Sequence, residues 1–394
     1  MSLPDYLRRQ IAADTEFLRV PGEWQLESGE VLHDVDIAYR TWGDRANAAE
    51  NTVLICHALT GSADVDAWWP GIIGTGKTFD PAQDFIVCVN ILGSCYGTTG
   101  PASLKPHSQQ RYRADFPRIS VRDMVELQRA LLDELGIDRI DLVTGPSLGG
   151  MQALEWAASY PERVGSVVPI GVGGRHSAWC IGISEAQRAA IAADPNWKGG
   201  YYTDDAPPAQ GLAAARMMAV CTYRSWDSFE ARFGREKHSA DLYQAQSYLQ
   251  HQGRKINERF DANTYVTLTH AMHTHDLARG RGSYPEVLKE MNRNDAAMGI
   301  MKDRNEQGNL VLAIRKSWWD SHGYGRRLFA LMHELRHAAI RVEECKFRAH
   351  HDNPATDHFW VWQIRTHLLL ETMWAYHFSK APLATSIQSL TEDD

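Results

Sequence analysis

Two features that mark exported or membrane proteins are missing from this sequence of 394 residues. The N-terminal stretch MSLPDYLRRQIAADTEF mixes charges of both signs and lacks the apolar core, about 7–15 residues long, of a signal peptide. No segment reaches the roughly 18 uninterrupted apolar residues that a membrane helix needs. We therefore expect a cytoplasmic protein that does not enter a membrane.

Cysteine is scarce, and neither sign of charge dominates. The six cysteines include no C-x-x-C pair, a distribution typical of reduced thiols in a cytoplasmic protein. They are Cys56, Cys88, Cys95, Cys180, Cys221 and Cys345. Because 41 basic residues are balanced by 49 acidic ones, nothing in the charge favours nucleic acid or an anionic membrane as a partner. We expect small-molecule partners.

A metal-binding pattern is absent as well. The string His333-Glu-Leu-Arg-His337 spaces two histidines as in a zinc-protease helix, but it matches only part of that motif. We expect no metal ion and no bound cofactor.

What the sequence does contain, from about residue 50 onward, is an alternation of short apolar runs with amphipathic stretches. The runs are too short for helices and are typical of buried strands. They are Thr52–Cys56, Phe85–Val89, Ile140–Thr144 and Val164–Ile170. This order predicts an α/β fold in which helices flank a mostly parallel sheet.

Helix signals lie between and after these runs. Ser120 followed by Asp123 resembles a capping box, and Gly136 is a typical helix stop. A second helix is predicted from Gly149 to the proline at position 161.

The chain changes character twice more. In residues 175–260, Ser184 is predicted to open a helix and the run 211–223 to form another; such helical inserts tend to cover active sites. We therefore expect a core at 1–174, a helical lid at 175–260 and a return to the core at 261–394. Past residue 290, however, no β/α unit can be recognised, since the last 104 residues hold 8 of the 17 histidines but only 4 of the 30 glycines.

The sequence Gly145-Pro-Ser-Leu-Gly149 carries the chemistry. It fits G-x-S-x-G, the nucleophile elbow of α/β-hydrolase folds, in which a sharp strand-to-helix turn presents the serine hydroxyl above the sheet. An apolar run precedes it and a helix signal follows it, as that turn requires. We predict Ser147 as the nucleophile, against the alternative of a tight turn with an incidental serine.

Two backbone amides are predicted to stabilise the oxyanion. Leu148 lies at the N-terminus of the following helix, where amides are free and the helix dipole is positive. Leu59, in the loop His57-Ala-Leu-Thr-Gly61 after the first apolar run, is the expected second donor. His57 itself is interpreted as a packed residue that orients this loop and not as an acid or base.

At this point the sequence resembles the homoserine O-acetyltransferase family. Beyond the elbow, the resemblance rests on several longer segments and covers about residues 15–290. These are 57–61, the loop 90–101, 145–156, 211–223 and Phe260-Asp-Ala-Asn-Thr-Tyr265. The stretch 175–180 also resembles fungal relatives, including a deacetylcephalosporin acetyltransferase.

The resemblance implies an α/β-hydrolase fold and a ping-pong reaction of methionine biosynthesis. Acetyl-CoA would acylate Ser147, and the hydroxyl of L-homoserine would then take the acetyl group. Arg216 matches the family arginine that holds the amino-acid carboxylate, a role suited to a planar guanidinium; the alternative is a salt bridge on a helix surface. Family members are commonly homodimers, which implies a homodimer here.

A serine nucleophile needs a histidine base and an orienting carboxylate, which normally follow it in the chain. The family's Asp-Gly and Gly-His-Asp motifs cannot be recognised after residue 291. Asp320 and His351 are our nominal acid and base, because their spacing of 31 residues is near that of the family. The alternative is that a histidine next to an aspartate arises by chance in this histidine-rich segment and has no catalytic role. A shift of the reading frame near residue 291 would explain the departure, and translating the gene in its other frames would test that hypothesis.

Two other functions remain open from sequence. An esterase of the same fold would use water as the acceptor, although it needs no clamp such as Arg216. A catalytically silent binding protein would keep the elbow and lack the base.

Overall fold

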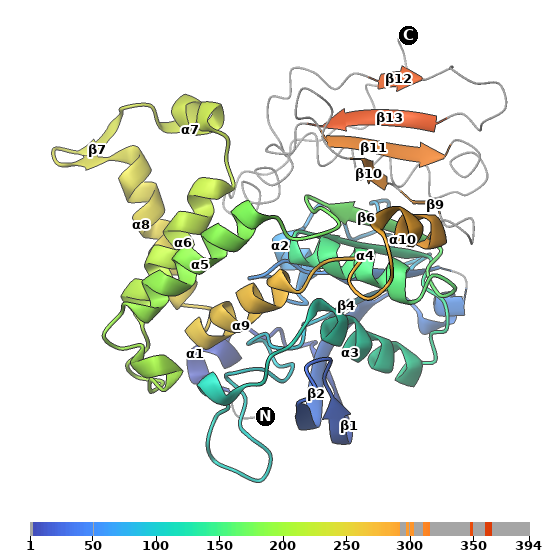
Figure 1. The fold of residues 1–394 in the computed structure, drawn as a ribbon, viewed down its shortest axis with the longest axis horizontal. Coiled ribbons are helices and arrows are strands. Elements are labelled where there is room, and N and C mark those ends of the chain that lie inside the picture. The colour runs from blue at the N-terminus through green and yellow to red at the C-terminus, as the bar shows by residue number, and fades with distance from the viewer. Residues whose placement is uncertain are drawn as a thin grey trace.

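The computed structural model describes residues 3–49 and 51–291 together with five short strands beyond them (Figure 1). The helices are α1 (Asp5–Arg8), α2 (Val65–Trp68), α3 (Val121–Glu134), α4 (Leu148–Ser159), α5 (Ala178–Ala192), α6 (Ala209–Thr222), α7 (Trp226–Phe233), α8 (Gln244–Asn257), α9 (Ala262–His273) and α10 (Tyr284–Met291), with 3-10 helices at Arg45–Ala49, Arg113–Asp115 and Lys198–Gly200. The strands are β1 (Glu16–Gln25), β2 (Val31–Trp42), β3 (Thr52–Cys56), β4 (Phe85–Val89), β5 (Leu142–Pro146), β6 (Ser166–Ile170), β7 (Lys237–Ser239), β8 (Leu242–Tyr243), β9 (Ala297–Met298), β10 (Ile300–Lys302), β11 (Leu310–Arg315), β12 (Phe347–Ala349) and β13 (Phe359–Ile364).

The main sheet has seven strands in the order β1-β2-β4-β3-β5-β6-β9. The pairs β1–β2 and β2–β4 are antiparallel, and every other neighbouring pair is parallel. Two smaller antiparallel sheets contain β10-β11-β13-β12 and β7-β8. The predicted mostly parallel sheet flanked by helices is therefore confirmed.

The central strands are buried on both faces, which explains their unbroken apolar sequences. In β3, Leu54 and Cys56 pack in the cluster that includes apolar side chains of α3 and α4. Val53 and Ile55, on the opposite face, pack in a second cluster with Phe79 from the loop before β4. The period of two along the strand thus supplies both layers of the core.

The helix α3 has the predicted ends. The Ser120 side chain accepts a hydrogen bond from the Asp123 amide, and the Asp123 carboxylate accepts one from the Ser120 amide, which completes the capping box. Gly136, just past the last helical turn, has φ 67°. Glycine adopts that left-handed conformation without steric cost, so the helix ends there.

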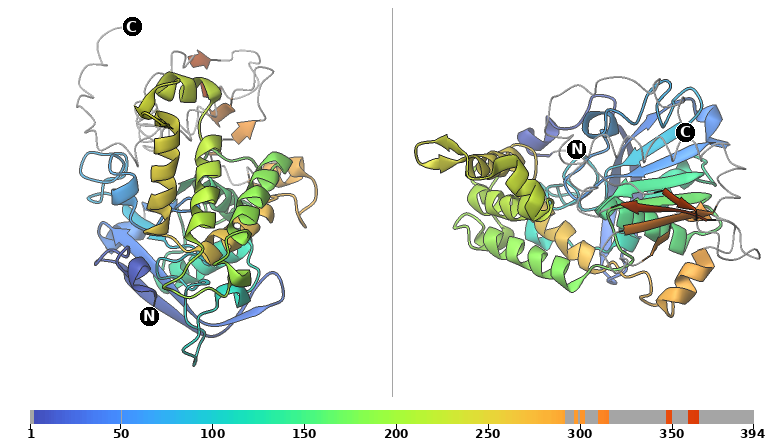
Figure 2. Two further views of the ribbon diagram at one scale, coloured as in Figure 1. Left: turned by 90° about the vertical axis from the view of Figure 1, so that its left-hand side faces the viewer. Right: turned by 90° about the horizontal axis from the view of Figure 1, so that it is seen from above.

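Helices α5, α6 and α8 lie side by side, away from the strands β1 and β2 (Figures 1 and 2). The prediction that Ser184 opens a helix is wrong. Helix α5 already begins at Ala178, and the Ser177 side chain caps it by accepting a hydrogen bond from the Cys180 amide. Ser184 lies inside this helix and is buried. The division of the chain at residues 174 and 260 remains a prediction.

Among the helices that the structure describes, none combines the length and the apolar character needed to cross a membrane. Every cysteine in the described part of the chain is a free thiol; these are Cys56, Cys88, Cys95, Cys180 and Cys221.

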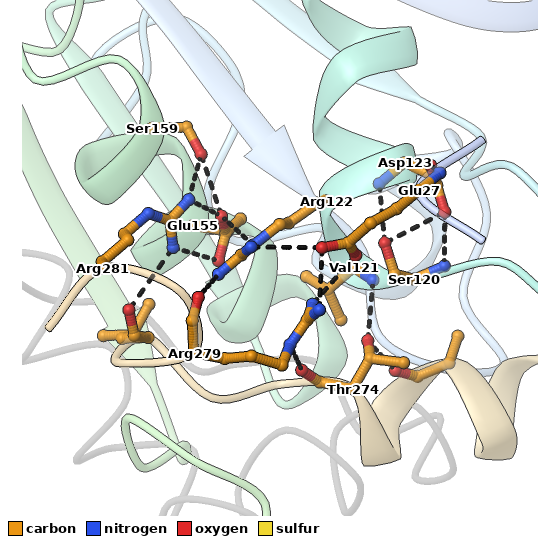
Figure 3. A network of polar contacts seen from close by, with 12 residues as sticks. Glu27, Ser120, Val121, Arg122, Asp123, Glu155, Ser159, Thr274, Arg279 and Arg281 are labelled. Atoms are coloured by element: carbon orange, nitrogen blue, oxygen red, sulfur yellow. Dashed lines mark hydrogen bonds and ion pairs between the residues drawn. The ribbon is translucent and has the colours of Figure 1, made fainter. Parts of the chain in front are cut away.

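A network of charged side chains ties α4 to distant segments (Figure 3). Glu155 of α4 is only 2 % exposed and forms ion pairs with Arg122 of α3, at 3.2 Å, and with Arg281. Arg122 also pairs with Glu27 at 3.1 Å, and Arg279 donates to both carboxylate oxygens of Glu27, at 2.7 and 2.9 Å. The network therefore joins the β1–β2 turn, α3, α4 and the segment after α9.

We predict that Glu155→Gln lowers the free energy of unfolding by about 3–5 kcal/mol, because it removes the carboxylate partner of Arg281 and leaves Arg122 with Glu27 alone. Urea titration would measure the change. Asp5→Asn is the control, since the Arg8–Asp5 pair is largely exposed and should cost less than about 1 kcal/mol. Equal effects of the two substitutions would contradict this account of the network.

Candidate active site

Ser147 lies at a sharp turn between β5 and α4. Its φ of 53° and ψ of −119° are unusual for a residue with a side chain, and it caps the N-terminus of α4. The turn is fixed on one side by a hydrogen bond of 2.8 Å from the Ser147 amide to the Ile170 carbonyl oxygen of β6. Ser147 is partly exposed, whereas its neighbours Pro146 and Leu148 are buried. This is the geometry of a nucleophile elbow.

The two glycines of the elbow are required by the Cys56 carbonyl group. A Cβ atom added at Gly145 or at Gly149 would overlap with the Cys56 carbonyl oxygen at the end of β3. A Cβ atom at Gly150 would come within 2.6 Å of the Val172 side chain. Backbones therefore approach at distances that only glycine allows.

This approach also brings the predicted oxyanion loop to the elbow. The position of a Cβ atom at Gly149 is 3.1 Å from the His57 carbonyl oxygen, so the loop after β3 lies against the first turn of α4. Leu148 is the first residue of α4, where amides have no partner within the helix. The direction of the Leu59 and Leu148 amides relative to the serine hydroxyl remains a prediction.

His57 is a packed residue that holds the loop. It is fully buried, its Nε2 accepts a hydrogen bond of 3.2 Å from the Ile91 amide, and its Nδ1 lies 2.9 Å from the Ala58 carbonyl oxygen. An amide can only donate, so Nε2 is the acceptor and Nδ1 carries the proton. Burial lowers the pKa of His57 to about 4, which keeps the ring neutral.

Beneath the elbow, three buried polar side chains connect α3 to the first turn of α4. Gln128 donates to Gln152 at 2.6 Å, and Trp156 donates to Gln128 at 2.8 Å. Gln152 in turn donates to the Leu148 carbonyl oxygen at 3.0 Å. All three are at most 1 % exposed, so the turn that follows Ser147 is held in a dry, fixed environment.

Arg216 is buried and not on a helix surface, because only 1 % of the residue is exposed. Its guanidinium lies 5.7 Å from the centre of the Tyr223 ring. Burial lowers the pKa of Arg216; Tyr223 opposes this shift, while the nearby positive charge of Arg259 adds to it. A buried cation flanked by an aromatic ring and a second cation is suited to an anionic ligand.

Arg259 has contacts at the site that the sequence did not indicate. It follows α8 and donates to the Thr60 carbonyl oxygen at 2.7 Å and to the Tyr96 hydroxyl oxygen at 3.1 Å. The only sequence signal is its position directly before the segment 260–265 that carries the family resemblance. The predicted acid and base, Asp320 and His351, lie outside the described residues.

Comparisons with known proteins place these features in context. A family model described as the alpha/beta hydrolase fold matches residues 51–309. A homoserine O-acetyltransferase of Nostoc punctiforme is 54 % identical over 327 residues, which cover 80 % of this chain and 92 % of the relative. One of Chlorobaculum parvum is 56 % identical over 337 residues, covering 84 % and 92 %.

The solved structures that are similar to this chain include proteins named for two different reactions. Homoserine O-acetyltransferase from Bacillus anthracis is 28 % identical with a TM-score of 0.64, covering 70 % of this chain and 80 % of that one. Esterase E22 is 27 % identical with a TM-score of 0.61, covering 68 % and 81 %. The fold thus accommodates both acyl transfer and ester hydrolysis.

We predict that Gly149→Ala removes the reactivity of Ser147. The added methyl group would overlap with the Cys56 carbonyl oxygen, so β3 and α4 would have to separate, at a cost of about 1–3 kcal/mol or more. Labelling by a fluorophosphonate probe would measure reactivity. Gly182→Ala is the control, because nothing lies within 4 Å of its added methyl group; in a helix it should stabilise the protein by about 0.5–1 kcal/mol. Labelling of Gly149→Ala at the parent rate would show that the close approach is not required.

We predict a pH effect from His57. Its folded-state pKa, about 4, lies below the ordinary value of 6.5, so the unfolded chain binds the proton first as pH falls. Its stabilising contribution is therefore complete above pH 6.5 and lost between pH 6.5 and 4. In His57→Gln, the decline in the free energy of unfolding across that range should be shallower, as urea titrations at several pH values would measure. Some decline should remain, because burial also lowers the pKa of His176 and of His270 to about 4. A decline as steep as in the parent protein would contradict the assignment.

Proposed function

This chain belongs to the homoserine O-acetyltransferases of the α/β-hydrolase family, and from that premise we propose that it transfers the acetyl group of acetyl-CoA to the hydroxyl of L-homoserine through an acetyl-Ser147 intermediate. The observation that carries the mechanism is the conformation of Ser147, a strained and partly exposed residue between a buried strand and a helix. The support for homoserine as the acceptor is the similarity to the named relatives.

In the first half-reaction, the Ser147 Oγ atom attacks the thioester carbonyl carbon while its proton passes to a base. The carbonyl oxygen becomes an oxyanion, which the amides of Leu59 and Leu148 would stabilise. The C–S bond then breaks, and coenzyme A leaves as the thiol after taking up the proton. The product is acetyl-Ser147.

In the second half-reaction, the homoserine hydroxyl attacks the acetyl carbonyl carbon and returns its proton, through the base, to Ser147. The same two amides serve the second oxyanion. Arg216 would hold the homoserine carboxylate with two parallel hydrogen bonds, which fixes the distance of the hydroxyl from the acyl group. No cofactor is expected, because acetyl-CoA is consumed as a substrate.

Asp320 and His351 remain our proposed acid and base. A chain without a working base would retain only the catalysis of the oxyanion hole and of binding, several orders of magnitude less. Fluorophosphonate labelling distinguishes these cases, since a silent protein should label no faster than Ser147→Ala.

We also infer that the protein works in the cytoplasm and as a homodimer. Reduced cysteines support the first inference. For the second, Ala219 and Val220 of α6 are buried within the chain and are unavailable to a partner, but Trp179 of α5 and Trp226 of α7 are 73 % and 75 % exposed. Light scattering of the purified protein would measure its mass.

The activity is tested by incubating the protein with acetyl-CoA and L-homoserine and following free thiol and O-acetylhomoserine. We expect equal amounts of both products, and neither with Ser147→Ala. Esterase activity is the second candidate, favoured by the similarity to esterase E22. Thiol release that is indifferent to homoserine would support the esterase and exclude the transferase.

We predict that Arg216→Met raises the KM for homoserine by about 10–100-fold, because a charge-assisted pair is worth about 1.5–3 kcal/mol. The rate of thiol release from acetyl-CoA alone should change little, since that half-reaction contains no amino acid. Initial rates at varied homoserine would measure both quantities. A loss confined to thiol release would mean that Arg216 does not bind the acceptor.

A further inference from the structure

We propose that Arg259 is a positioning residue that acts on the Leu59 amide through two hydrogen-bonded peptide units. The inference deepens the proposed function, since it takes Leu59 as an oxyanion donor. It rests on a continuous series of contacts between the end of α8 and the loop after β3.

The first contact is between the guanidinium and the loop. Arg259 Nη1 donates to the Thr60 carbonyl oxygen at 2.7 Å, and Nη2 lies 3.5 Å from the Thr60 hydroxyl oxygen. Hydrogen bonds from a charged donor are stronger than those between neutral groups. The Thr60 carbonyl group is therefore held in one direction by a cation.

The next two steps follow from peptide geometry. The Thr60 carbonyl group and the Gly61 amide belong to one planar unit, so fixing one end fixes the other. The Gly61 amide donates to the Ala58 carbonyl oxygen at 2.8 Å. That carbonyl group shares a planar unit with the Leu59 amide, which points the opposite way in a trans peptide. The orientation of the proposed oxyanion donor is thus set by the series Arg259, Thr60–Gly61, Ala58–Leu59.

The charge of Arg259 also acts along this series of hydrogen bonds. A cation at one end of linked hydrogen bonds polarises each peptide unit and strengthens the next donor, an effect of about 10–30 % per bond. The neutral His57 ring contributes from the other side, because its Nδ1 proton is directed at the same Ala58 oxygen, at 2.9 Å. The Ala58 carbonyl oxygen therefore accepts both hydrogen bonds, and both polarise the peptide unit that contains the Leu59 amide.

Arg259 is itself held firmly enough to do this. The Tyr96 hydroxyl donates to the Arg259 carbonyl oxygen at 2.6 Å and accepts from Arg259 Nη1 at 3.1 Å. Burial raises the pKa of Tyr96, so the hydroxyl keeps the proton that it donates. Nη1 serves both the Thr60 carbonyl oxygen and the Tyr96 hydroxyl oxygen, while Nη2 lies near the Thr60 hydroxyl oxygen. A lysine has a single nitrogen and would lose the contact of Nη2.

The test compares Arg259→Met and Arg259→Lys with Arg254→Met, which changes an exposed arginine in the last turn of the preceding helix α8. Acylation is measured as the burst of nitrophenolate from p-nitrophenyl acetate, which has no carboxylate for a cation to bind. We expect Arg259→Met to slow acylation by about 10–100-fold, less than complete loss of an oxyanion donor. Arg259→Lys should be intermediate and Arg254→Met unchanged, with the KM for homoserine within a few-fold of the parent value in all three.

Hydrogen exchange gives a readout that does not depend on activity. In Arg259→Met, the Gly61 amide should exchange about tenfold faster, the effect of losing roughly one hydrogen bond. Unchanged exchange in a folded variant would overturn the proposal, as would faster exchange with normal acylation. A higher KM for homoserine with normal acylation would instead assign Arg259 to the carboxylate. If the parent protein shows no burst, the proposed function fails, and the exchange of Gly61 alone decides whether Arg259 fixes the turn.

Discussion

The site depends on one close approach between backbones: the Cys56 carbonyl oxygen occupies the space that Cβ atoms at positions 145 and 149 would need. Because both residues are glycine, the end of β3 comes into contact with the elbow, and the loop after β3 reaches the first turn of α4. Ser147 keeps a φ of 53°, a conformation that costs a residue with a side chain about 1–3 kcal/mol. Buried strands on both sides of β5 fix the ends of the turn, so this strain cannot relax.

Apolar burial and polar contacts have different roles around that turn. The two core clusters hold the sheet and helices together, but apolar packing alone leaves the direction of a peptide group weakly specified. Orientation comes from buried polar groups, namely Gln152 on the Leu148 carbonyl oxygen, His57 on the Ala58 carbonyl oxygen and Arg259 on the Thr60 carbonyl oxygen. Glu155 adds the connection between α4 and the rest of the core. An active site needs this second kind of contact, because stabilisation of an oxyanion depends on where a donor points.

The sequence predicted best those features that depend on a few consecutive residues, such as the bounds of buried strands and the elbow. The bounds of β3 and β4 match the apolar runs, because strands buried on both faces are apolar throughout. Strands β5 and β6 begin two residues later than predicted, since Ile140 and Val164 form only an isolated bridge with each other. The start of α5 was missed because Trp179 and Ile181 are apolar yet exposed, which hides the helical periodicity. The elbow was found because its motif spans five consecutive residues.

Arg259 could not be predicted in the same way, because its contact with Thr60 joins residues 199 apart in the chain. That contact exists only when the segment after α8 packs on the loop after β3. The two arginines of the site come from the part of the chain after residue 175, whereas the nucleophile and the oxyanion loop come from the part before it. Since the positive charge of Arg259 contributes to the lowered pKa of buried Arg216, two like charges share a space of low dielectric constant. A carboxylate bound to Arg216 would offset the cost of burying that cation, which is a physical reason for this site to prefer an amino-acid alcohol over water or a simple alcohol.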